Sequence, residues 1–67
     1  MFAIYQDNVC RRQGDKINPA TFTVCELDEG ASISPAGYTI GKVWPIMKGA
    51  TIDQARTLCD ELNKMFD

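Results

Sequence analysis

Three cysteines are the first side chains in this 67-residue chain that could carry chemistry. Cys10 precedes Arg11 and Arg12, and neighbouring positive charge favours the thiolate, the nucleophilic form of cysteine. The favoured interpretation of Cys10 is still an ordinary thiol in a loop or at a strand end. Cys25 and Cys59 fall in stretches that predict a strand and a helix. For the three together we expect small buried apolar residues, with one disulfide plus a free thiol as the alternative.

The chain offers few other routes to catalysis. It contains no histidine, so it has no imidazole base and no Ser-His or Cys-His pair, and a zinc site would need all three cysteines plus a carboxylate. Adjacent acids, as in "CELDEG" and at Asp60 and Glu61, are usually solvated, and the five glycines form no phosphate-binding loop. We predict that the protein is not an enzyme and has no catalytic residue, metal site or cofactor.

The net charge of −2 and the pI of about 4.9 have the wrong sign for a domain that binds phosphates. A nucleic-acid partner is therefore disfavoured, although Arg11, Arg12 and Lys16 cluster in one loop. The sequence has no apolar run of the length of a membrane span, and "MFAIYQDN" lacks the basic flank of a signal peptide. We expect a complete small gene product in the cytoplasm, with no membrane partner.

The elements that would position these side chains begin with a helix at the C-terminal end, in "TIDQARTLCDELNKMFD". Thr51 and Gln54 have the spacing of a capping box. At 100° per residue the apolar side chains fall within an arc of about 140°, as a core-facing helix requires. These are Ile52, Ala55, Leu58, Cys59, Leu62, Met65 and Phe66. The other side carries Asp53, Arg56, Thr57, Asp60, Asn63 and Lys64.

Three strands are predicted, at residues 1–6, 21–27 and 38–44. The first is apolar on both faces, which is typical of a central or doubly covered strand. In the second the apolar phase changes near Cys25, which indicates a bulge or a strand end. Pro45 should end the pairing of the third strand or place it on an edge. "RRQGD", "DEG" and "SPAG" are expected to be turns.

These elements predict one domain over residues 1–67, of the α+β class. It consists of a three-stranded antiparallel sheet with one C-terminal amphipathic helix packed across one face. One helix covers only one face, so part of the set Tyr5, Tyr38, Trp44, Ile46 and Met47 should remain on the uncovered face or its edge. Alternatively, the loops at residues 8–20 and 28–37 fold over that face.

Exposed aromatic, apolar and arginine side chains are typical of contact sites. The sequence therefore predicts a non-catalytic protein that binds a protein partner, with a homodimer as one form of that partner. The predicted contact residues are Tyr5, Arg11, Arg12, Tyr38, Trp44 and Ile46. The alternative is a nucleic-acid-binding accessory protein that uses the basic loop and the sheet aromatics.

In size, acidity and lack of catalytic residues, the chain resembles the short proteins by which phages and prophages inhibit host machinery, anti-CRISPR proteins among them. The resemblance covers no specific residue string. It implies a phage- or mobile-element-encoded inhibitor whose partner is a host protein. The contact surface would then be a flat patch with charged residues at its rim, such as Arg11, Arg12, Asp28 and Glu29.

Overall fold

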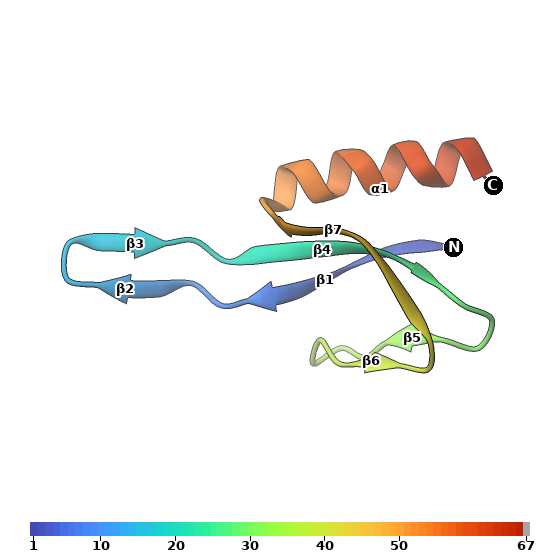
Figure 1. Cartoon of the computed structure of the whole chain (residues 1–67), viewed down its shortest axis with the longest axis horizontal. Helices are drawn as coiled ribbons and strands as arrows, with labels where there is room; N and C mark the ends of the chain where they lie inside the picture. The colour runs from blue at the N-terminus through green and yellow to red at the C-terminus, as the bar shows by residue number, and fades with distance from the viewer. Residues whose placement is uncertain (67) are drawn as a thin grey trace.

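A three-stranded antiparallel sheet and a C-terminal helix form the body of the protein, which confirms the predicted α+β class (Figure 1). The computed structural model describes residues 1–66. The sheet contains β1 (Phe2–Asn8), β4 (Thr21–Leu27) and β7 (Val43–Ala50), in the order β1-β4-β7. The helix α1 (Ile52–Phe66) begins as predicted: Gln54 N–H donates to the Thr51 hydroxyl and Thr51 N–H donates to Oε1 of Gln54, both at 3.2 Å.

The central strand is β4, whereas the sequence favoured a central or doubly covered position for the first strand. β1 lies at an edge of the sheet, and its side chains alternate between the two faces of the sheet. Phe2 and Ile4 pack with the core, while Ala3 and Tyr5 point to the other face of the sheet and are half-buried. Apolar side chains on both faces are thus compatible with an edge strand here, because neither face of β1 is fully open to solvent.

The predicted turn in "RRQGD" is present at Gly14 and Asp15, but the three residues before it form a strand: β2 (Arg11–Gln13) and β3 (Lys16–Asn18) pair as a hairpin around the turn. Gly14 has φ 59°, and Asp15 does not have positive φ, so the two-residue loop fits a type II′ turn, which requires glycine first. Residues 9–19 are all exposed and project from the body beyond β1 and β4 (Figure 1). We call residues 9–19 the arm. It helps to make the molecule 43 Å long but only 16 Å thick.

The predicted third strand, residues 38–44, is divided between two strands, β6 (Thr39–Ile40) and β7. β6 pairs with β5 (Ser32–Ile33) in a small hairpin around the "SPAG" turn. The chain then reverses at Gly41, where φ is 82° and an added Cβ would lie 3.1 Å from Cα of Ala31. β7 starts at Val43 and continues through Pro45, which is tolerated because β7 is an edge strand.

The predicted irregularity near Cys25 is confirmed in the pairing of β4 with β7. Val24 is paired with Met47 and Cys25 with Pro45, so Ile46 is an extra residue without a partner in β4. The bulged residue therefore belongs to β7, whereas the sequence had indicated a change of phase in the strand of Cys25.

The core is one small cluster that joins the helix to all three strands. Ala55 and Cys59 of α1 are buried with Phe2, Val24 and Ala50 from β1, β4 and β7. The partly buried residues around the cluster are Ile4, Phe22, Met47, Leu58 and Leu62. The helix contributes small side chains at its buried positions, so the sheet supplies most of the apolar volume.

Candidate binding surfaces

The three cysteines occupy two kinds of environment, two buried and one exposed. All three are free thiols, and Cys25 and Cys59 are buried as predicted. Burial raises the pKa of both buried thiols, which disfavours the thiolate. Cys10 is exposed between β1 and β2, so the expectation that it is buried is wrong, and its position is that of a loop thiol. Within residues 1–66, no three His, Cys, Asp or Glu side chains are grouped to hold a metal ion.

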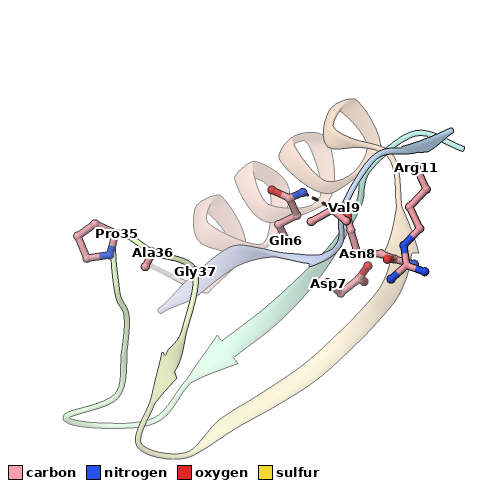
Figure 2. Close-up of a pocket in the computed structure, with 8 residues that line it drawn as sticks. All are labelled: Gln6, Asp7, Asn8, Val9, Arg11, Pro35, Ala36 and Gly37. Atoms are coloured by element: carbon pink, nitrogen blue, oxygen red, sulfur yellow. Dashed lines mark hydrogen bonds between the residues drawn. The ribbon is translucent and has the colours of Figure 1, made fainter. Parts of the chain in front are cut away.

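A hollow of about 410 Å³ separates the end of β1 from the tip of the β5–β6 hairpin (Figure 2). Asp7 and Arg11 are the charged side chains in its wall. The other lining residues are Gln6, Asn8, Val9, Pro35, Ala36 and Gly37. The lining thus combines one carboxylate and one guanidinium with polar and small apolar residues.

Asp7 is held by hydrogen bonds that connect all three strands of the sheet. Its carboxylate accepts bonds from the hydroxyls of Thr21 and Thr23 on β4 and from the backbone N–H of Gly49 on β7, the last at 3.0 Å. The register skips Asp7 between the pairs Gln6–Phe22 and Asn8–Thr21, so Asp7 is the bulged residue of β1. The threonine hydrogen bonds, followed by that of Gly49, lower the pKa of Asp7 below its ordinary value of 3.8.

We expect the Asp7 network to make the protein acid-sensitive. A carboxyl whose pKa is lower in the folded state stabilises the fold when ionised, and this contribution is lost as the pH falls. The loss should start at about pH 5 and continue through the lowered pKa of folded Asp7. Urea unfolding at neutral and acid pH should show a smaller pH dependence for Asp7→Asn than for the wild type, together with lower stability at pH 7. Equal acid losses in both proteins would contradict this assignment.

The predicted contact residues are distributed over three parts of the molecule. Tyr5 is half-buried on β1, and Arg11 and Arg12 are exposed on the arm. Tyr38 and Trp44, in the segment that follows the SPAG turn, have 73% and 57% of their surface exposed. Ile46 in the same segment is 49% exposed.

The register separates Trp44 from Tyr5, two members of the set of which part was expected on the uncovered face or its edge. Trp44 is opposite Glu26, which is opposite Phe2, so the Trp44 side chain belongs to the side of the sheet that carries the core cluster. Tyr5 is opposite Thr23, in the alternate row. Met47 is half-buried against the core and is not part of a free surface. Residues 8–20 do not fold back over the sheet, because most of them form the arm.

Ile40 joins the exposed set, although the sequence did not single it out as a contact residue. It is 54% exposed and belongs to β6, two residues after the exposed Tyr38. The two-residue spacing of Tyr38 and Ile40, typical of one face of a strand, was the available signal in the sequence. We call Tyr38, Ile40, Trp44 and Ile46 the exposed apolar segment, because the four lie within nine consecutive residues.

Comparison with protein-family models, curated proteins and solved structures found no match to this chain. Within residues 1–66, no helix has both the length and the apolar character needed to cross a bilayer. The exposed apolar segment and the arm are the two surfaces from which we infer function.

Proposed function

We propose that this is a non-catalytic protein that binds another protein through the exposed apolar segment. The observation that carries the proposal is the distribution of apolar residues among positions 1–66. Nine large apolar side chains are exposed, whereas six apolar residues are buried, and of those six only Phe2 and Val24 are larger than cysteine. Because a partner can cover exposed apolar surface, binding would supply burial that the small core does not.

The exposed apolar segment has the composition of an interface centre. Tryptophan and tyrosine are the types most enriched among residues that dominate binding energy, and two isoleucines lie beside them in the sequence. From residue 38 to residue 48, the only charged side chains are those of Lys42 and Lys48. The proposal takes α1 to lie across one face of the sheet and the partner to contact the surface around β6 and β7.

A protein of this kind acts by occupying a surface of its partner. This mode of action suits a small inhibitor encoded by a phage or another mobile element, working in the cytoplasm on a host protein. A second copy of the chain is the other protein partner considered, because a homodimer would also bury the segment.

Trp44→Ala is expected to weaken partner binding by at least about fivefold, because an interfacial tryptophan commonly contributes more than 1 kcal/mol. Tagged wild-type protein and each variant are expressed in cells, and the proteins that co-purify with them are compared. The dissociation constant is then measured with the purified partner. Met65→Ala is the matched control, because Met65 is also exposed but lies on α1. Both variants should keep the wild-type urea midpoint.

Light scattering on the purified chain distinguishes the two kinds of protein partner. A doubled mass that returns to that of the monomer in Trp44→Ala identifies a second copy. The proposal fails if Trp44→Ala binds as tightly as the wild type, or if it loses binding only because it unfolds.

A further inference from the structure

The strand register of the arm separates its side chains into two unlike faces. Arg11 is paired with Asn18 and Gln13 with Lys16, and side chains that are directly opposite or two residues apart share a face. One face therefore presents Arg11, Gln13, Lys16 and Asn18 together, and we call it the polar face of the arm. The other face carries the pair Arg12 and Ile17.

Charge is also divided between the arm and the rest of the chain. The arm has three cations (Arg11, Arg12 and Lys16) against one carboxylate, Asp15, for a net charge of +2. The remaining residues have four cations against eight carboxylates, for a net charge of −4. The net charge of −2 is thus the sum of two regions of opposite sign. At the level of the sequence, that net charge had disfavoured a nucleic-acid partner. The basic region is the one that projects from the body (Figure 1).

We propose that the polar face of the arm binds the major groove of duplex DNA. That groove is about 12 Å wide and admits a two-stranded β-ribbon, which is the structure formed by β2 and β3. Arginine and lysine contact phosphates and guanine, and glutamine and asparagine can pair with adenine, so all four side chains of this face are of types that contact duplex DNA.

An acidic protein is a poorer fit for this face. Protein interfaces are centred on apolar or aromatic anchors, and the polar face has none, because Ile17 points to the opposite side of the ribbon. Duplex RNA is also disfavoured, since the major groove of an A-form helix is too deep and narrow for side chains to read. The inference is independent of the proposed function, because it uses residues of the arm and none of the exposed apolar segment.

The test measures fluorescence anisotropy of a labelled DNA duplex titrated with the full chain at low salt, where phosphate contacts are strongest. Arg11→Ala and Lys16→Ala should each weaken binding by about fivefold or more, as expected when a side chain that binds a phosphate or a base is truncated. Arg12→Ala is the matched control, because it removes the same charge from the neighbouring position but from the other face. It should change the affinity less than about twofold. Trp44→Ala should leave DNA binding unchanged.

Salt dependence gives a second readout. The slope of log K against log salt should fall by about 1 for each cation that no longer neutralises a phosphate, so the double variant Arg11→Ala/Lys16→Ala should reduce the slope by about 2. Four results would each overturn the inference: no duplex binding at low salt; equal weakening by Arg12→Ala; single-stranded DNA bound as tightly as the duplex; or a polyglutamate peptide bound as tightly as DNA. A urea midpoint near that of the wild type shows that each variant is folded.

Discussion

Phe2→Ala is expected to remove most of the stability of this protein. Phe2 is 8% exposed, belongs to the central cluster, and has a ring centroid 5.7 Å from that of Phe66 at an interplanar angle of 44°. Truncation of a buried phenylalanine costs about 3–5 kcal/mol. A domain of 67 residues has a total unfolding free energy of about 3–10 kcal/mol. Urea unfolding followed by circular dichroism should therefore find the variant largely unfolded or close to its midpoint in buffer.

Phe66→Ala is the matched control for Phe2→Ala. The two rings are in contact, but Phe66 is 67% exposed, so its removal leaves little or no cavity. The expected loss is about 0.5–1.5 kcal/mol, the range for an aromatic pair. If both variants lost similar stability, the aromatic contact at the helix end would matter more than the cluster around Phe2.

The parts of the fold that could be predicted from sequence are those encoded by local signals. The helix was indicated by the pair Thr51 and Gln54 and by an apolar stripe of period 3.6, neither of which depends on distant residues. The first two long strands were recognised from alternation and β-branched or aromatic content. Short connections and the absence of a second helix were enough to indicate an antiparallel sheet.

The arm could not be recognised because nothing in it is buried. Strand prediction depends on one apolar face, and both faces of the β2–β3 ribbon are solvated, so "RRQGDKIN" shows no alternation. The position of β4 at the centre was also hidden, because strand order is set by non-local pairing. The division at Gly41 depends on a positive φ and on close contact with Ala31, which only the folded chain brings near.

For the candidate surfaces, the sequence predicted which apolar residues would be exposed better than it predicted where on the protein they would lie. Tyr38, Trp44 and Ile46 are exposed, as expected because one helix can cover the apolar residues of only one face of the sheet. Which of them share a face with Tyr5 could not be predicted, because side-chain direction depends on register. A bulge such as the one at Ile46 shifts the phase of every residue that follows.

The structural role of Asn63 could not be predicted from the sequence. It falls on the polar side of the helix, yet its side-chain amide pairs with the backbone of β1. The N–H of Phe2 donates to Oδ1 of Asn63 at 3.0 Å, and Nδ2 of Asn63 donates to the carbonyl of Phe2 at 3.3 Å. The amide thus takes the place of a neighbouring strand at the free edge of β1, 61 residues away in sequence.

Asn63→Ala is expected to lower the unfolding free energy by about 1–3 kcal/mol, because it leaves a partly buried N–H and C=O of Phe2 without their partner. Lys64→Ala is the control, since it truncates the next residue, which is exposed on the helix. Hydrogen exchange makes the test specific to this pair of hydrogen bonds. The Phe2 amide should lose protection in Asn63→Ala, while the Leu27 amide, which donates to the carbonyl of Met1 at 2.8 Å, should exchange more slowly than it. If the Phe2 amide stayed as protected as in the wild type, the helix would hold β1 by apolar packing alone, and the edge of β1 would be open to another strand.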